Sequence, residues 1–457
     1  MKFLNKSLTQ PLANGRVWDK LIYFGLCLFI FLLPWQTRWI FKDAFINGEV
    51  WEYGRWSLYG TEIILIPVLM LGIIKWLLEY KKMDGRQRLA EIKNEFKGIN
   101  LWLILLLIWS AVVMVWSSNQ GLAWYGWLKL AEGVGLFWLI TKYFSNKIFQ
   151  GISHSLIAAG LIQAGFGISQ FLNQLNVPAN KWLGMARIDV TAAGTSVIEF
   201  LDMRWLRAYG GLPHPNILGG FLAICLLANI ICLWQHQHSS AVDRKTSALN
   251  LFYGFSAIVL FLGLILSFSR GAWLAFSICF MSGSLYWYIK KSKDQFRISL
   301  VLTVLFCLVF GVVWYIFPNQ LFITRFDMQT RLEKQSNDQR IFLYRQAQEL
   351  FNERPVLGVG LSNYTFRQWQ KDSTQPAWFY QPVHDAYFLT LVELGLPGFI
   401  LLIMIVIHAF RYRSQYSLLL VALLILGLFD HYLRSLYFGT ILWWLVIALN
   451  AAPKKIQ

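Results

Sequence analysis

Long uninterrupted apolar segments are the feature that most constrains this sequence. They recur in runs of about 17–23 residues, the length that an α-helix needs to cross a hydrocarbon core of ~30 Å. Inside lipid each backbone amide must be paired within its own segment, so such runs form helices. A transmembrane barrel would show alternating segments of ~10 residues, and none are visible in the sequence. We therefore predict an all-α integral membrane protein.

The charged residues indicate the same class. Only 14% of the residues are charged, where a soluble domain carries roughly 25%, so the chain cannot be solvated as one globule. The formal net charge is +17, and its cations lie mostly in short connections between apolar runs, as the positive-inside rule describes for cytoplasmic loops. Because no compact basic domain is present, we expect contact with membrane lipids and no nucleic-acid partner.

The apolar runs predict about twelve membrane-spanning helices. In chain order they cover residues 20–36, 61–79, 100–117, 122–142, 150–173, 215–235, 251–269, 271–289, 299–317, 386–408, 415–430 and 434–451. With the N-terminus in the cytoplasm, every connection assigned to the cytoplasm carries Lys or Arg, and an even number of spans returns the C-terminus to that side. The fourth run contains Lys129 and Glu132, which could pair on one helix face or face the bundle interior.

One extracytoplasmic loop, residues 318–385, is far longer than the others. Apolar residues recur at helical spacing from Gln339 to Asn352, and Asn337 and Asp338 are candidate N-caps. We expect this amphipathic helix to lie along the membrane surface as a lid or substrate platform. The chain then divides into N-terminal spans (1–200), a central region that includes the long loop (201–410) and C-terminal spans (411–457).

Four short segments carry the residues best suited to chemistry. They are residues 207–216, 267–271, 338–340 and 382–387. The predicted topology places all four at the outer face of the membrane, although their positions were not used to define the spans.

Arg270 and His384 are the most informative residues in these segments. Arg270 interrupts two adjoining apolar runs, and a charge near the membrane costs several kcal/mol unless it is paired or hydrated. It either closes a tight helical hairpin or binds phosphate oxygens with its guanidinium. His384 is the best candidate base, because an imidazole can accept a proton from a hydroxyl near physiological pH. His214 is expected to shape the backbone before the sixth span, and His431 is interpreted as solvated or interfacial.

Together these segments resemble the O-antigen ligase and polymerase superfamily. In that family an arginine precedes a His-Pro-Asn element, and a Ser-Arg-Gly element joins two helices. An arginine-led loop helix ends in Gly-x-Gly, and a His-Asn pair opens the next helix before Glu-x-Gly-x-x-Gly. The matching residues here are Arg207 with His214, Pro215 and Asn216; Ser269, Arg270 and Gly271; Arg340 with Gly358 and Gly360; and His384 and Asp385 with Glu393, Gly395 and Gly398. Asp385 stands where asparagine is usual, so it either orients His384 and raises its basicity or caps the helix.

The resemblance, which covers about residues 205–400, implies a GT-C-like fold and glycan transfer on the outer face of the bacterial cytoplasmic membrane. The donor would be a glycan on a polyprenyl diphosphate, and the acceptor a lipid A core, another lipid-linked glycan or a protein. The residues that it assigns are Arg207, Arg270 and Arg340 for the diphosphate, His384 for activation of the acceptor, and Asp385, His214 and Asn216 in support. Transfer would be direct, inverting and independent of a metal ion or cofactor.

Metal binding finds little support in the sequence. There is no Asp-x-Asp or clustered ligand set that argues for a divalent ion. The external carboxylates Asp43, Glu49 and Glu52 are expected to be solvated.

Other functions remain open. Polysaccharide polymerases and protein O-oligosaccharyltransferases share the same motifs and differ in their acceptor. A flippase for the lipid-linked glycan is the alternative from another class, but transporters commonly show inverted repeats and polar residues at mid-membrane. No repeat is evident here, and the notable polar residues gather at one face, which favours an enzyme.

Overall fold

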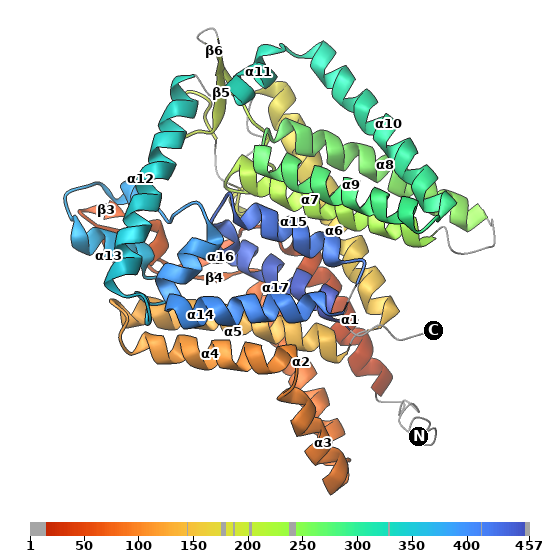
Figure 1. Cartoon of the computed structure of the whole chain (residues 1–457), viewed down its shortest axis with the longest axis vertical. Coiled ribbons are helices and arrows are strands. Elements are labelled where there is room, and N and C mark those ends of the chain that lie inside the picture. The colour runs from red at the N-terminus through yellow and green to blue at the C-terminus, as the bar shows by residue number, and fades with distance from the viewer. Residues whose placement is uncertain are drawn as a thin grey trace.

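The computed structural model describes residues 15–143, 145–174, 180–185, 188–200, 203–236, 244–327, 330–412 and 414–452. The described chain is mostly helical, with short two-stranded antiparallel sheets in its loops (Figure 1). The two termini, predicted to be cytoplasmic, lie outside the described residues.

Each predicted span contains a helix. These helices are α1 (Gly15–Leu32), α2 (Glu62–Lys81), α4 (Ile99–Met114), α5 (Gln120–Lys142), α6 (Asn146–Asn173), α7 (Pro215–His236), α8 (Arg244–Leu266), α9 (Arg270–Ile289), α10 (Lys293–Ile316), α14 (Ala386–Phe410), α15 (Ser417–Gly427) and α17 (Tyr437–Ala451). Within the described residues, α2, α6, α7, α8, α9, α10 and α14 are long and apolar enough to cross a membrane, and the bent pair α3 (Gly85–Glu95) and α4 raises these 7 to as many as 8. A mostly helical, multi-pass membrane protein is thus confirmed, whereas the count of twelve spans stays a prediction.

Two helices form the centre of the bundle. The apolar window of α7 is 100% buried, as expected for a helix that is apolar on every side. It packs against α6, α8, α9 and α15, while α17 packs against α5, α14, α15 and α16 (Tyr432–Ser435). Since lipid is as apolar as leucine, close packing between helices has to provide the stability of such a bundle.

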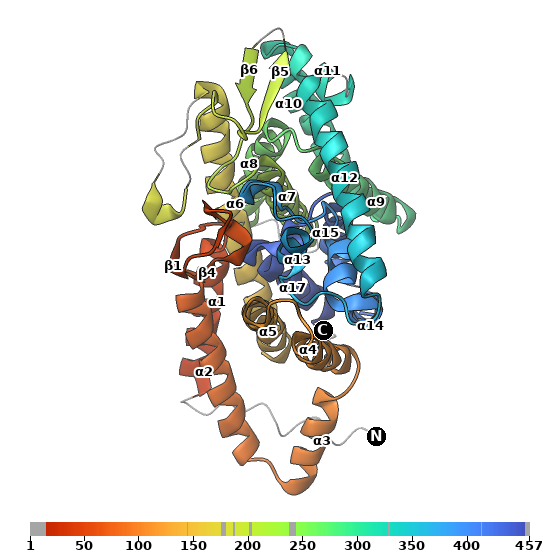
Figure 2. The same cartoon turned by 90° about the vertical axis from the view of Figure 1, so that its left-hand side faces the viewer.

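The long loop and the basic helix α3 lie at opposite ends of α4. After the C-terminal end of α4, Ser118 N donates to Val359 O at 3.3 Å and Asn119 N donates to Asn363 Oδ1 at 2.6 Å. The helix α3 immediately precedes the N-terminal end of α4. Figure 2 shows the end of the bundle that carries the loop helices α12 (Arg331–Glu353) and α13 (Tyr364–Lys371) and the strands β1 (Arg38–Lys42) and β4 (Trp56–Tyr59).

The predicted loop helix exists, but its start was placed too late. Helix α12 begins at Arg331, so the predicted caps Asn337 and Asp338 lie inside it. Glu333 in its first turn pairs with arginines from two other elements, and these tertiary contacts stabilise a turn that the local cap signals did not indicate.

The short strands of the loops were not predicted. They are β2 (Phe45–Ile46), β3 (Glu49–Val50), β5 (Val197–Phe200) and β6 (Met203–Leu206), in addition to β1 and β4, and they pair β1 with β4, β2 with β3 and β5 with β6. A further loop helix, α11, covers Gln320–Asp327.

The charges of the fourth predicted span are half-buried and paired within the protein. Lys129 on α5 pairs with Glu62 on α2 and with Glu132 at 3.4 Å. Pairing between helices avoids the cost of a bare charge in the membrane.

A break in α14 joins the long loop to the bundle. Gly395 has φ 66°, and Pro397 follows it. On the loop side, Val359 N donates to Val392 O and Gly360 N donates to Glu393 O, each at 2.9 Å. The Gly-x-Gly and Glu-x-Gly elements are therefore two sides of one backbone contact.

Replacing Gly395 with alanine is expected to destabilise the protein. A Cβ at this position would lie 2.0 Å from Val356 O, and the left-handed backbone itself costs an L-residue ~1–2 kcal/mol. Thermal unfolding in detergent should show a clear loss of stability for Gly395→Ala. Gly311→Ala on α10, where a Cβ would meet nothing within 4 Å, is the matched control and should unfold like the wild type.

Candidate functional site

Arg207 lies in the segment before α7. Its side chain is buried, and it donates from Nε to Ser267 O at 2.9 Å and from Nη2 to Phe268 O at 3.1 Å. The same guanidinium donates to Asn216 Oδ1 and Ser196 Oγ, each at 2.8 Å. Most of its donors are therefore used to hold the turn between α8 and α9 and the amide of Asn216.

Arg270, the first residue of α9, contacts the long loop. Its Nη2 lies 2.8 Å from Glu333 Oε2 on α12, and its Nη1 donates to Arg325 O at 2.8 Å. Arg325 on α11 also pairs with Glu333, and it donates to Phe268 O at 3.0 Å. Arg270 thus does not merely close a hairpin, because one carboxylate from the loop is shared between it and a second arginine.

Positive charge exceeds negative charge in this cluster of Arg207, Arg270, Arg325 and Glu333, which we call the arginine cluster. Burial lowers the pKa of the Arg325 guanidinium to about 10. Glu333 raises this pKa, whereas the neighbouring cations Arg270 and Arg340 lower it further. Burial, together with Arg325, also lowers the pKa of Arg207. The cluster consequently favours an anion.

Arg340 lies close to the arginine cluster but outside it. It is half-buried on α12 and forms no hydrogen bond or ion pair with any described residue. Its guanidinium is therefore available to a ligand.

Removing the shared carboxylate is expected to loosen α12. Glu333→Gln leaves two partly buried arginines without their partner, and breaking such a buried pair costs about 3–5 kcal/mol. In thermal unfolding we expect a lower midpoint for the variant, and a larger stabilisation by added pyrophosphate than in the wild type. Glu353→Gln on the same helix is the control, because that glutamate forms more exposed pairs with Arg367 and Lys371, whose loss costs ~0–1 kcal/mol.

An imidazole–carboxylate pair adjoins the arginine cluster. His384 Nδ1 lies 3.7 Å from Asp430 Oδ1. Asp430 is buried in the connection between α15 and α16, and its Oδ1 accepts from His431 N at 2.8 Å. The rings of His384 and His431 lie 5.0 Å apart.

The charge states of this pair follow from its surroundings. Burial alone would raise the pKa of Asp430, but His384, His431 and His214 outweigh it and lower the pKa well below its usual range. Burial lowers the pKa of His431 to about 4 and that of His214 to about 3. At pH 7, therefore, Asp430 is ionised, and His214 and His431 are neutral.

Asn216 connects the two halves of the site. Its Oδ1 accepts from Arg207, and its Nδ2 donates to Asp430 Oδ2 at 3.3 Å. Asn216 N donates to His214 Nδ1 at 3.1 Å, which fixes the backbone before α7. The segments 207–216, 267–271 and 382–387, far apart in sequence, thus meet at one place.

The structure distinguishes the two alternatives for Asp385 and corrects the interpretation of His431. Asp385 accepts from Tyr387 N and Phe388 N at 2.8 and 2.9 Å, and from Tyr344 OH at 2.9 Å. It caps α14, and the carboxylate beside His384 is Asp430 instead. His431 was interpreted as solvated or interfacial, but it is buried against His384.

A ligand set for a metal ion also exists in the described part of the chain, although the sequence did not reveal it. His384, Asp430 and His431 can each offer one ligand atom, and these atoms lie within 4.8 Å of one another. The Nδ1 atom of His431 is held by Ser435 Oγ at 2.6 Å.

The external carboxylates all have partners within the protein and are not simply solvated: two of them pair with arginines, and the third accepts a backbone hydrogen bond. Asp43 accepts from Arg55 at 2.9 Å, and Glu52 pairs with Arg38 and Arg55. Glu49 accepts from Ala377 N at 3.0 Å.

The fold and site together define a multi-pass membrane protein with an anion-attracting arginine cluster beside an imidazole–carboxylate pair. Residues 255–403 match the family model described as O-antigen ligase. This match confirms the resemblance to the O-antigen ligase superfamily and indicates a glycan-processing enzyme type. No curated protein matches the chain.

Proposed function

We propose that this protein is a glycosyltransferase that moves an oligo- or polysaccharide from a polyprenyl-diphosphate donor to an acceptor hydroxyl. The observation that carries the proposal is the Asn216 bridge, which joins an anion-attracting cluster to a carboxylate-paired imidazole. Diphosphate is an anion and a good leaving group, so transfer requires cationic stabilisation and a base, and no general acid.

In the proposed reaction the acceptor oxygen attacks the anomeric carbon as the bond to the diphosphate breaks, and the electron pair leaves with the diphosphate. The acceptor proton passes to His384 Nε2. Asp430, facing Nδ1, keeps a proton on that nitrogen and stabilises the imidazolium that forms. The separation of 3.7 Å between Nδ1 and Oδ1 is long for a hydrogen bond, and catalytic contacts of this kind often shorten only when substrate is bound.

The arginines take different parts in this scheme. Arg270 and Arg340 are the direct ligands of the diphosphate, and phosphate oxygens replace the Glu333 carboxylate at Arg270. Arg207, whose donors are mostly engaged, acts through its charge and by positioning Asn216. One backside displacement of this kind inverts the anomeric centre.

We place the reaction on the outer face of the bacterial cytoplasmic membrane, with both termini in the cytoplasm. The basic predicted cytoplasmic connections and the location of the long loop at the other end of α4 support this orientation. The acceptor is a lipid A core, a lipid-linked glycan or a protein.

Reconstitution in liposomes tests the proposal against the flippase alternative. The purified protein would be supplied with a fluorescent polyprenyl-diphosphate oligosaccharide in one leaflet and with candidate acceptors in the medium. We expect a glycosylated acceptor and free polyprenyl diphosphate, and no movement of intact donor between leaflets. Movement of the donor without any product would overturn the transferase.

A further inference from the structure

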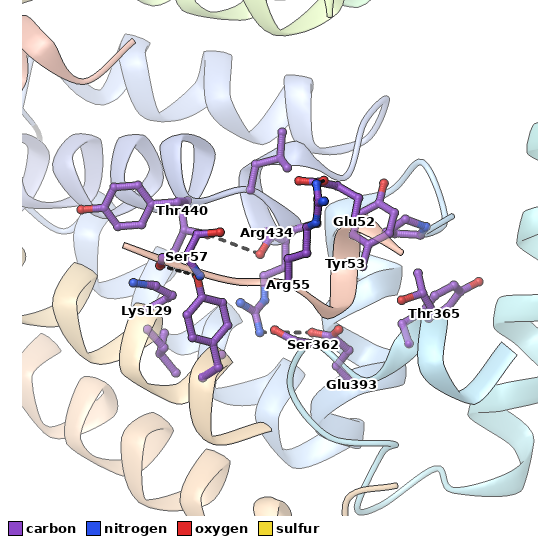
Figure 3. A pocket seen from close by; sticks show the side chains of 18 of the residues that line it. Glu52, Tyr53, Arg55, Ser57, Lys129, Ser362, Thr365, Glu393, Arg434 and Thr440 are labelled. Carbon is purple, nitrogen blue, oxygen red and sulfur yellow. Dashed lines mark hydrogen bonds and ion pairs between the residues drawn. The ribbon is translucent and has the colours of Figure 1, made fainter. Parts of the chain in front are cut away.

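A pocket lies next to the imidazole–carboxylate pair. Its volume is about 900 Å³ when its open mouth is included. The strand region 38–59, the start of α13 and the helices α5, α14, α16 and α17 line it, as Figure 3 shows for the labelled side chains. We call it the outer pocket.

The outer pocket adjoins His384. Pro382, two residues before His384, is one of its lining residues. Ser435 lines it too and contacts His431 Nδ1 at 2.6 Å. Tyr53 also lines the pocket, and its ring lies 6.4 Å from that of His431.

The cations of the outer pocket are neutralised by carboxylates. Glu52 pairs with Arg38 and, at 3.2 Å, with Arg55. Arg55 has a second carboxylate partner, Asp43 at 2.9 Å, so two carboxylates balance these two arginines. Arg434 lies 3.4 Å from Glu393, and these two side chains approach each other in Figure 3. The remaining cation, Lys129, is paired with Glu62. The pocket thus offers fixed donors and acceptors with no surplus charge, which is the opposite of the arginine cluster.

The remaining lining suits a sugar ring. Tyr53 and Tyr59 supply aromatic surface with polar tips. Ser57 is 2% exposed, and its Oγ has no hydrogen-bond partner among the described residues. Because an unpaired buried hydroxyl costs free energy, it marks a position where a ligand hydroxyl belongs.

We propose that the outer pocket binds the uncharged sugars of the acceptor glycan and presents the acceptor hydroxyl to His384. This inference rests on the proposed function for the direction of the attack. In a displacement with inversion the acceptor must approach opposite to the leaving diphosphate. Contacts run from Arg207 through Asn216 and Asp430 to His384, whereas Pro382 and Ser435 connect the outer pocket to the two histidines. The acceptor therefore occupies the neutral outer pocket and the diphosphate the arginine cluster, with His384 between them.

Binding of neutral tetrasaccharides tests the pocket without any need for catalysis. Maltotetraose, cellotetraose and chitotetraose would be examined by saturation-transfer difference NMR with the detergent-solubilised protein. We expect the wild type to bind at least one of them. Glu52→Gln should weaken that binding about tenfold, because it removes a charged acceptor. Ser57→Ala removes no side-chain hydrogen bond within the described residues and should weaken the binding about threefold.

Asp43→Asn is the matched control. It also removes a carboxylate from Arg55, but Asp43 does not line the pocket, so binding should stay at the wild-type level. In a transfer assay Glu52→Gln should raise the KM for the acceptor about tenfold and leave the donor KM and kcat nearly unchanged.

The outcomes separate the two proposals. Arg270→Gln should lower kcat/KM for the donor about 10²–10³-fold and leave tetrasaccharide binding intact. Absence of transfer by the wild type, with pocket-dependent binding retained, would overturn the transferase and support the sugar pocket. Absence of tetrasaccharide binding, or equal binding by the wild type, Glu52→Gln and Ser57→Ala, would overturn the pocket proposal.

Discussion

His384→Ala is expected to lower kcat for glycan transfer by about 10²–10⁴-fold, the usual contribution of a positioned general base. The donor KM should change little, because His384 faces the acceptor and not the diphosphate in the proposed arrangement. Single-turnover transfer from a polyprenyl-diphosphate glycan would measure the effect. Activity within a few-fold of the wild type would show that another group takes the proton.

Two neighbouring aspartates provide a matched comparison for this prediction. Asp430→Asn removes the carboxylate beside His384 Nδ1 and should lower kcat by about 10–100-fold, as expected for the loss of an orienting partner. Asp385→Asn removes a carboxylate next to His384 in sequence, but asparagine is as good an N-cap as aspartate, so activity should remain near the wild-type level. Equal losses in both variants would contradict the assignment of Asp430.

Arg270→Gln is expected to lower kcat/KM for the donor by about 10²–10³-fold, the cost of removing one donor to developing anionic charge. Arg270→Lys should recover only part of the activity, because an ammonium keeps the charge but cannot hold two phosphate oxygens in a fork. Donor titrations in the transfer assay would give the separate changes in kcat and KM.

Arg331→Gln is the control for Arg270. Arg331 lies on the same loop helix as Glu333 and pairs with Glu199, but its side chain is 70% exposed. Its loss should leave donor kinetics unchanged. A similar loss of activity in both variants would indicate a general electrostatic effect and not a diphosphate site.

The membrane class and the helical segments followed from the sequence, because the length of an apolar run and the backbone's need for internal hydrogen bonds are local properties. The side of the membrane assigned to the long loop rests on the placement of cations and stays a prediction. The predicted start of the loop helix α12 was less accurate. The first turns of α12 depend on Glu333 and its two arginine partners, a contact between distant segments that no cap signal encodes.

Only part of the candidate site could be predicted from the sequence. Arg270 and His384 stood out because each is a polar residue beside apolar runs, whereas Arg207 was assigned only through the family resemblance. Asp430 and His431 were overlooked, although the predicted topology already placed their connection on the same face as His384. Arg325 and Glu333 gave no signal of their own, since charged residues in a loop are usually solvated, and only the fold buries them together.

The outer pocket could not be predicted from the sequence at all. Its walls come from the strand region after α1, from the long loop and from the C-terminal helices, and its neutrality depends on which carboxylate meets which arginine. Glu52 and Asp43 have the same character in the sequence, and only the structure places one of them in the pocket.

One measurement tests the central claim most directly. Transfer from a polyprenyl-diphosphate glycan would be compared in EDTA for the wild type, His384→Ala and Arg270→Gln, with unfolding curves to verify that each protein is folded. The account predicts transfer by the wild type in EDTA and its collapse in both variants. Unchanged transfer in the variants would contradict the site, and wild-type activity that is lost in EDTA and restored by a divalent cation would contradict the metal-independent mechanism.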